Sequence, residues 1–268
     1  MDHLDVDGAS IAYRVRGDGA PVLFIHGSGT YSEQFGSVLD ELGDGVRTIV
    51  YDRRGFGSSL GARSRRFSDH VSDAVALIDS LAGGPVTLVG SSAGGVLALR
   101  IAVERPDLVS ALVLVEPAFQ MALTPSLGAN AALARVNARW LLRRDPDGAA
   151  VAFYRWATAY KDGGNQFDTY PEPWRTQSVR HGTSALRELT QLVRPAPSRR
   201  SLASITAPTS VVIGDAGLSV FHRTSRRALR AMENAVEVPA PGAAHLVYTD
   251  QPAICAQTIT ETMARSTK

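Results

Sequence analysis

Six short apolar runs constrain the fold of this chain more than any other feature of its sequence. They are VLFI (22–25), RTIVY (47–51), VTLV (86–89), ALVLV (111–115), SVVI (210–213) and VEV (236–238). Most are continuous rather than alternating, which is typical of strands covered on both faces, as in a parallel sheet. Helical patterns at 68–83 and 93–106 lie between successive runs, and this alternation predicts an α/β architecture. Near the N-terminus, Asp7-Gly8 between two further strand-like stretches predicts an antiparallel hairpin at the sheet edge.

The connection between the fourth and fifth runs departs from this alternation. It holds about ninety residues, whereas loops in α/β units usually hold about 2–6 residues. Stretches 129–144 and 146–160 within it have helical patterns. The sequence therefore predicts an inserted helical cap at 117–206, with 1–116 and 207–268 forming the core.

The cap holds half of the aromatic residues of the chain, including all three tryptophans. Most of them are expected to form the cap's own core, because aromatic side chains bury large apolar surfaces. A minority are expected to face the sheet and line a pocket, since ligand pockets are mostly apolar and aromatic. The candidates for substrate binding are Phe119, Phe153, Trp156 and Trp174.

Composition narrows the classes of function. The chain has 268 residues, a net charge of +2 and a single cysteine, Cys255, which excludes an internal disulfide. One large domain is expected, with no nucleic-acid partner and no membrane partner, because no apolar run approaches roughly 20 residues. No signal-peptide pattern is visible, so a soluble cytoplasmic protein is expected. No metal-ligand cluster or dinucleotide loop is visible either, so no metal or cofactor is expected. The oligomeric state stays open.

The stretch LVGSSAGG at 88–95 carries the strongest chemical signal. It contains G-x-S-x-G with Ser92 at its centre, whereas Ser91 does not fit this register. An apolar strand precedes the motif and a helical pattern follows it. In that context the motif forms a sharp turn that exposes a nucleophilic serine. Such a turn lies at the carboxyl edge of the sheet, where α/β proteins bind their substrates. Ser92 is therefore the predicted nucleophile.

Together with three further motifs, this turn makes the chain similar to the α/β-hydrolase family over nearly its whole length. FIHGSG (24–29) resembles the family's oxyanion loop, YDRRGFGSS (51–59) resembles its D-x-R-G-x-G-x-S loop, and VPAPGAAHLVYTDQP (238–252) resembles its histidine loop. The resemblance implies a mostly parallel, eight-stranded sheet with helices on both faces and an inserted helical cap.

The base that the serine needs is predicted among six histidines. Only His245 lies on a loop after the last predicted strand and after the serine in chain order, as the family's base does. His26 resembles the structural histidine of the family's oxyanion loop. His70 is expected on a surface helix and His222 at the start of a helix. His245 is therefore the predicted base.

The position of the acid is open between two carboxylates. Most members of the family carry an aspartate three residues past a glycine at the end of the seventh strand. In this chain Gly217 stands at that place, and Asp215 is displaced from it by two positions. A subgroup that includes zearalenone-type lactonases and one branch of haloalkane dehalogenases carries the acid directly after the sixth strand. Glu116 lies there, 24 residues after Ser92. Glu116 is the preferred prediction and Asp215 the alternative.

These residues predict acyl transfer. The imidazole of His245 takes the Ser92 proton as the hydroxyl attacks a carbonyl, while the carboxylate orients the imidazole. Backbone N–H groups of Ala93 and of Gly27 or Ser28 are expected to hold the oxyanion. The serine at the turn argues against dehalogenase and epoxide hydrolase activity, which in this fold use an aspartate there.

The leading functional prediction is cofactor-free hydrolysis of a small-molecule ester or lactone that is medium-sized and largely apolar, as the long aromatic cap suggests. A tryptophan late in the cap of the lactonases resembles Trp174, which is why Trp174 is expected in the pocket. Within the same fold, a C–C bond hydrolase and a cofactor-free perhydrolase are alternatives. A ligand-binding protein without turnover is a further alternative, favoured by the displaced acid motif.

Overall fold

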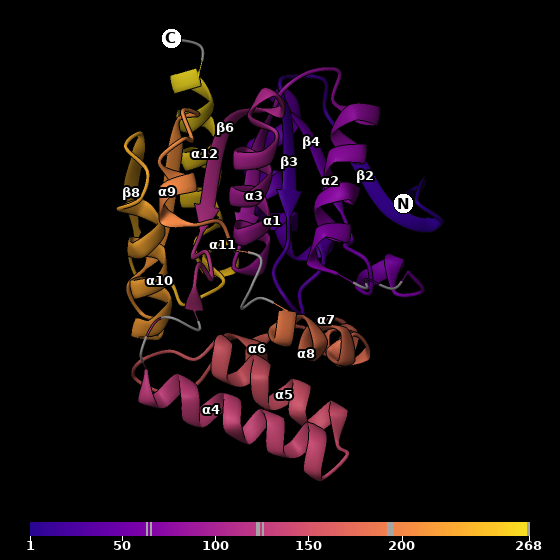
Figure 1. Ribbon diagram of the computed structural model, residues 1–268, viewed down its shortest axis with the longest axis vertical. Helices are drawn as coiled ribbons and strands as arrows, with labels where there is room; N and C mark the ends of the chain where they lie inside the picture. The colour runs from indigo at the N-terminus through magenta and orange to yellow at the C-terminus, as the bar shows by residue number, and fades with distance from the viewer. Residues whose placement is uncertain (63, 65, 122–123, 125, 192–195, 267–268) are drawn as a thin grey trace.

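The computed structural model describes residues 1–266 apart from 63, 65, 122–123, 125 and 192–195. It contains an eight-stranded sheet in the order β1-β2-β4-β3-β5-β6-β7-β8, with helices on both faces (Figure 1). The strands are β1 (Asp2–Val6), β2 (Ala9–Arg16), β3 (Pro21–Ile25), β4 (Arg47–Tyr51), β5 (Val86–Ser91), β6 (Val109–Val115), β7 (Thr209–Gly214) and β8 (Ala235–Ala240). The predicted α/β architecture is confirmed.

Strand β2 runs antiparallel to both of its neighbours, β1 and β4, and the remaining strand pairs are parallel. The predicted hairpin turns at Asp7 and Gly8, which both have positive φ angles, as a two-residue turn between twisted strands requires. All residues of β5 and β7 are buried, which explains their continuous apolar runs. The parallel alignment brings the carboxyl ends of β3 to β8 to one edge of the sheet.

The helices of the core form two layers (Figure 1). Helices α1 (Gly36–Leu42) and α12 (Pro252–Ser266) pack together on one face, and α2 (Phe67–Leu81) and α3 (Ala93–Glu104) pack together on the other. Nine of the twelve residues of α3 are buried, as its small and apolar sequence predicts. Helix α10 (Ser219–Leu229) follows β7, and the short helix α11 (Val247–Asp250) lies within the histidine loop, after His245. Short 3-10 turns lie at Ser32–Phe35, Gly43–Gly45, Gly57–Ser59 and Pro106–Leu108.

The start of α2 differs slightly from the prediction. The helical pattern at 68–83 opens on Ser68, a residue type that predicts an N-terminal cap, but the helix begins at Phe67 and the capping position is Arg66. The backbone N–H of Arg66 donates to Asp69 Oδ2 at 3.0 Å. The carboxylate of the first turn therefore anchors the helix start, and Ser68 is one residue inside it.

A layer of helices between β6 and β7 covers the carboxyl edge of the sheet (Figure 1). It consists of α4 (Leu127–Asn137), a π-helical turn (Ala138–Leu142), α5 (Pro146–Ala157), α6 (Gln166–Thr169), α7 (Glu172–Arg180) and α8 (Gly182–Gln191). The last helix of the predicted cap, α9 (Arg199–Leu202), instead lies beside α3. Leu202 and Ile205 are buried in the same cluster as the side chains of α3, so this end of the inserted segment packs with the core.

None of the helices in the part of the chain that the structure describes is both long enough and apolar enough to span a lipid bilayer.

Candidate active site

Ser92 occupies the sharp turn between β5 and α3. Its backbone has φ 52° and ψ −116°, a conformation that is rare for a residue with a side chain. Two glycines allow the turn: a Cβ on Gly94 would lie 2.1 Å from the Ile25 carbonyl oxygen, and a Cβ on Gly90 would lie 2.6 Å from the Gly94 oxygen. Ser91 is the last residue of β5 and is fully buried. The strand and helix thus cross closely and present Ser92 at the carboxyl edge of the sheet.

A chain of hydrogen bonds joins Ser92 to a histidine and a carboxylate. Ser92 Oγ lies 3.0 Å from His245 Nε2, and His245 Nδ1 lies 2.9 Å from Glu116 Oε2. If Nδ1–H donates to the carboxylate, Nε2 is left to accept the serine proton. The structure therefore brings together three residues that lie on separate loops after β5, β6 and β8.

Glu116 is the carboxylate that reaches His245, and its backbone explains why. It directly follows β6 with φ 42°, and its N–H donates to the Val212 carbonyl oxygen of β7 at 3.0 Å. The N–H of Gly214 donates to its Oε1 at 3.1 Å. Asp215 is exposed, and its Oδ1 accepts the Gly242 N–H at 2.7 Å. Asp215 thus ties down the start of the histidine loop, while Glu116 contacts the imidazole.

Burial shifts the pKa values of His245 and Glu116 in opposite directions. It lowers the pKa of His245 to about 3, with a smaller effect from the nearby His222. It raises the pKa of Glu116 well above its usual value, and the bond from the Gly214 N–H opposes that rise. Both directions follow from the loss of water around the charged forms. His245 is therefore neutral at pH 7, the state in which an imidazole accepts a proton.

An aromatic ring fixes the orientation of the imidazole. Phe221, from α10, stacks on His245 with ring centroids 3.6 Å apart and planes inclined by 20°. His222, the fourth residue of α10, places its Nε2 3.7 Å from Glu116 Oε1. The helix after β7 thus packs against both the imidazole and the carboxylate, although no motif in its sequence assigns it to the site.

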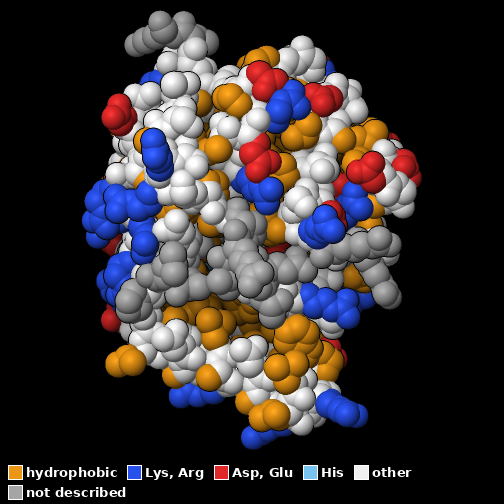
Figure 2. Space-filling view, in the orientation of Figure 1, with side chains coloured by type: hydrophobic (Ala, Val, Ile, Leu, Met, Phe, Trp, Pro, Cys, Tyr) orange, Lys and Arg blue, Asp and Glu red, His pale blue; other side chains and the backbone are white. Residues whose placement is uncertain are grey.

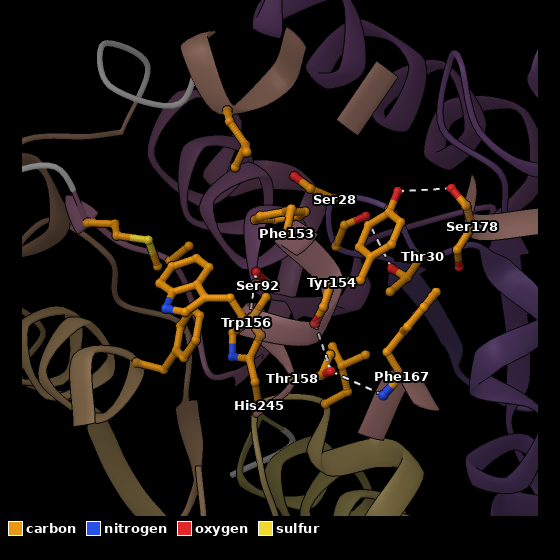
Figure 3. Close-up of a pocket in the computed structure, with 18 of the residues that line it drawn as sticks. Ser28, Thr30, Ser92, Phe153, Tyr154, Trp156, Thr158, Phe167, Ser178 and His245 are labelled. Carbon is orange, nitrogen blue, oxygen red and sulfur yellow. Dashed lines mark hydrogen bonds between the residues drawn. The ribbon is translucent and has the colours of Figure 1, made fainter. Parts of the chain in front are cut away.

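Ser92 and His245 open into an apolar cavity between the cap and the core. Figure 2 shows hydrophobic side chains gathered where the cap faces the core, and Figure 3 shows the cavity itself. Phe153 and Trp156 line it, as expected from the sequence. Further lining side chains are Met121, Tyr154, Phe167, Tyr170, Leu189, Phe221 and Leu246.

The structure corrects the other two substrate-binding candidates. Phe119 is fully buried in the core cluster that contains the side chains of α3, because the N–H of the preceding Ala118 donates to the Ser92 carbonyl oxygen at 3.1 Å and holds this segment at the start of α3. Trp174, on α7, packs edge-on against Tyr170 with ring centroids 5.6 Å apart. Tyr170 lines the cavity and Trp174 lies behind it, so neither Phe119 nor Trp174 is among the lining residues.

A buried ion pair lies beside the FIHGSG stretch (24–29), and the sequence predictions do not include it. Arg53 and Glu188 form hydrogen bonds with each other and are 0% and 3% exposed. His70 Nε2 lies 3.8 Å from Glu188 Oε1. His70 is therefore buried, contrary to the expectation of a surface helix, because α8 of the cap covers this part of α2. No local motif signals the pair, since its partners are 135 residues apart in sequence.

Two remaining points concern the role of His26 and the presence of a metal site. His26 has its Nδ1 2.8 Å from the Gly27 oxygen, and its Nε2 accepts the Arg53 N–H at 3.0 Å, so both ring nitrogens are engaged in the loop. Within the described residues, no group of three or more histidine, cysteine or carboxylate side chains has an arrangement suited to a metal ion.

Comparisons with known proteins agree with this architecture. The sequence pattern of the Alpha/beta hydrolase family matches residues 22–258. The chain is 28% identical to 2-(acetamidomethylene)succinate hydrolase of Mesorhizobium japonicum over 273 aligned residues, covering 96% of this chain and 92% of that protein. It is 34% identical to the uncharacterized hydrolase YraK of Bacillus subtilis over 117 residues, or 42% of this chain and 43% of that protein. The match thus spans less than half of YraK.

Solved structures show the same fold. A thermophilic esterase from Thermogutta terrifontis has a TM-score of 0.77 at 24% identity, with 99% of this chain and 97% of that chain covered. Est816, described as an N-acyl homoserine lactone degrading enzyme, has a TM-score of 0.77 at 20% identity, with 97% and 99% covered. With the family pattern matching most of the chain and the fold shared throughout, this protein belongs to the α/β-hydrolase family.

Proposed function

We propose that this protein is a serine hydrolase that cleaves a carboxylic ester or lactone with a medium-sized, largely apolar acyl part through an acyl-enzyme. The observation that carries the proposal is the hydrogen-bonded chain from Ser92 through His245 to Glu116, which opens into an apolar cavity. A serine, an imidazole and a carboxylate in this order form the machinery of acyl transfer.

In the first half of the reaction, His245 Nε2 takes the proton of Ser92 as Oγ bonds to the substrate carbonyl carbon. Glu116 stabilises the imidazolium that forms. When the tetrahedral intermediate collapses, the bond to the leaving oxygen breaks and His245 returns the proton to that oxygen. The acyl group stays on Ser92. In the second half, His245 takes a proton from water as the water oxygen bonds to the acyl carbon. The bond from this carbon to Ser92 Oγ then breaks, His245 returns the proton to Oγ, and the carboxylic acid leaves.

The developing oxyanion needs N–H donors near Ser92. Ala93 is the first residue of α3, so its N–H has no acceptor within the helix. The Gly27 carbonyl oxygen accepts from Thr30 Oγ1 at 3.1 Å and from Arg53 Nη2 at 2.9 Å. Because the peptide bond is trans, the Ser28 N–H points opposite to this carbonyl. Ser28 and Ala93 are therefore the proposed donors of the oxyanion hole.

The lining of the cavity supports an uncharged acyl part. None of its described lining residues is a lysine or an arginine. Two of the hydroxyls in its lining donate within the protein: Ser28 Oγ donates to Glu188, and Thr158 Oγ1 donates to the Tyr154 carbonyl oxygen. A substrate carboxylate would find no counter-charge there and would lose its water, which is costly. This argues for neutral esters or lactones over substrates that carry a free carboxylate.

Esters of matched length test this proposal. We expect p-nitrophenyl hexanoate to be hydrolysed with a kcat/KM at least about 10²-fold above that of mono-p-nitrophenyl adipate, whose chain ends in a carboxylate. A fluorophosphonate is expected to label Ser92 stoichiometrically. Protein that neither reacts with the fluorophosphonate nor turns over any ester or lactone would instead be a ligand-binding member of the fold. A preference for the adipate ester would contradict the uncharged acyl part.

Phe153→Ala tests the lining of the cavity. We expect kcat/KM for p-nitrophenyl hexanoate to fall by about 10- to 100-fold, with that for the acetate changed by less than about 3-fold, because only the longer chain reaches the removed ring. Trp174→Ala is the control, since Trp174 lies behind Tyr170. It is expected to lower the melting temperature and to leave the hexanoate-to-acetate ratio unchanged. The reverse outcome would make Trp174 the lining residue.

A further inference from the structure

The cap contributes one charged residue to a buried cluster beneath the oxyanion loop. Glu188 lies on α8 of the cap, whereas its partners Arg53 and Ser28 lie on the loops after β4 and β3. Arg53 donates to both carboxylate oxygens of Glu188, with Nη2 3.0 Å from Oε2. Ser28 Oγ donates to the same Oε2 at 2.5 Å. A single cap carboxylate therefore holds two core loops that are adjacent to Ser92.

The same arginine also orients the peptide between Gly27 and Ser28. Arg53 Nη2 donates to the Gly27 carbonyl oxygen at 2.9 Å, and His26 Nδ1 lies 2.8 Å from that oxygen. With the carbonyl held on this side, the trans peptide directs the Ser28 N–H to the other side. Arg53 thus holds the Gly27 carbonyl oxygen, and Glu188 holds both Arg53 and the Ser28 hydroxyl.

Arg53 and Glu188 are the charged residues of this cluster, and His70 is neutral. Burial raises the pKa of Glu188, but the Arg53 guanidinium and the hydrogen bonds it receives outweigh this and place its pKa below the usual value. Burial, with a contribution from Arg53, lowers the pKa of His70 to about 3, so His70 is neutral. Removing the charge of Glu188 therefore leaves the Arg53 guanidinium buried without a counter-charge, which forces the arginine and its loop to rearrange.

We infer that Glu188 is a positioning residue of the oxyanion hole: through Arg53 and the Ser28 hydroxyl, the cap holds the Ser28 N–H where the tetrahedral intermediate needs it. The inference rests on the proposed serine-hydrolase function. It predicts that Glu188 contributes more to the stability of the transition state than to substrate binding. The reason is that the oxyanion hole stabilises the substrate oxygen most strongly when this oxygen becomes charged.

Two substitutions of Glu188 test this inference in the full chain. Glu188→Gln keeps the shape and removes the charge, and is expected to lower kcat for p-nitrophenyl hexanoate by about 10²-fold with KM changed by less than about 3-fold. Glu188→Asp keeps the charge but is one methylene shorter, and is expected to lower kcat by about 10-fold. The Ki of hexylboronic acid, which forms a tetrahedral adduct with Ser92, is expected to rise by the same factor as kcat falls.

Asp73→Asn is the matched control, because it breaks the neighbouring buried pair with Arg54. This pair does not touch the oxyanion loop. We expect Asp73→Asn to lower the melting temperature as Glu188→Gln does, with kcat and the boronic acid Ki within about 3-fold of the unmodified protein. If Glu188→Gln lowers only the melting temperature, or raises only KM, the inference is wrong. If Glu188→Gln does not fold, a Glu188→Asp variant with unchanged kcat and Ki overturns it.

Measurements on the unmodified protein distinguish a failure of this inference from a failure of the proposed function. Ester turnover and inhibition by the boronic acid establish Ser92 as a working nucleophile before any Glu188 variant is measured. Their absence would contradict the proposed function itself. Their presence, together with Glu188 variants that leave kcat and Ki unchanged, would contradict only the role of Glu188.

Discussion

Ser92→Ala is expected to lower kcat for ester hydrolysis by about 10⁴- to 10⁶-fold, because removing the nucleophile of a triad leaves only the catalysis that binding and the oxyanion hole provide. KM is expected to change little, since the hydroxyl is a small part of the cavity surface. Steady-state kinetics with p-nitrophenyl hexanoate, together with loss of fluorophosphonate labelling, measure this effect.

Ser91→Ala is the control for this variant, because the neighbouring serine is buried at the end of β5 and does not line the cavity. It is expected to keep kcat within about 10-fold, since it removes no group that touches the reacting atoms. An inactive Ser91→Ala beside an active Ser92→Ala would reverse the assignment of the two serines.

Glu116→Gln is expected to lower kcat by up to about 10⁴-fold. An amide in place of the carboxylate can donate to Nδ1, which favours the imidazole tautomer with its proton on Nε2. That tautomer cannot accept the proton of Ser92, and the neutral amide gives the imidazolium less stabilisation. The pre-steady-state burst of p-nitrophenol measures the acylation step directly, and it is expected to slow by the same factor.

Asp215→Asn is the matched control for Glu116→Gln. The asparagine keeps an oxygen that accepts the Gly242 N–H, so the histidine loop stays anchored. We expect kcat to change by less than about 3-fold, because Asp215 does not contact His245 in this structure and its replacement stays within the range of surface substitutions. A large loss with Asp215→Asn and none with Glu116→Gln would assign the acid to the loop after β7.

The sheet and its sharp turn were predictable because the information for them is local. Continuous apolar runs report burial on both faces of a strand, and helical periodicity between them reports the crossover. The nucleophile's register was readable for the same reason: Gly90 and Gly94 are required within two residues of Ser92, where their missing side chains allow strand and helix to cross.

The sequence near Glu116 and Asp215 does not decide which of the two carboxylates contacts His245. Glu116 and Asp215 lie on loops after neighbouring strands, and both loops approach the histidine loop. Their roles depend on the directions of their side chains. Pairing of Glu116 with Val212 turns its carboxylate toward His245, and the Gly242 N–H draws Asp215 away. Spacing from Ser92 favoured Glu116, but only the packed loops place it against the imidazole.

In the aromatic cap, too, the sequence predicts some features and the tertiary structure decides others. Its sequence predicted helices and a surplus of large apolar side chains, because periodicity and composition are properties of the chain itself. Which rings face the cavity depends on how α5, α6 and α7 are rotated against the core. Phe153 and Trp156 point inward, while Trp174 lies behind Tyr170.

The sequence by itself determined the α/β core, the turn at Ser92 and the candidate base, since each follows from periodicity, glycine spacing or chain order. Only the tertiary structure decided which carboxylate meets His245, which aromatic rings line the cavity and that Glu188 lies against Arg53 and Ser28. The physical reason is that these contacts join residues more than a hundred positions apart, or depend on the rotation of a helix. Such contacts leave no pattern in the neighbouring sequence.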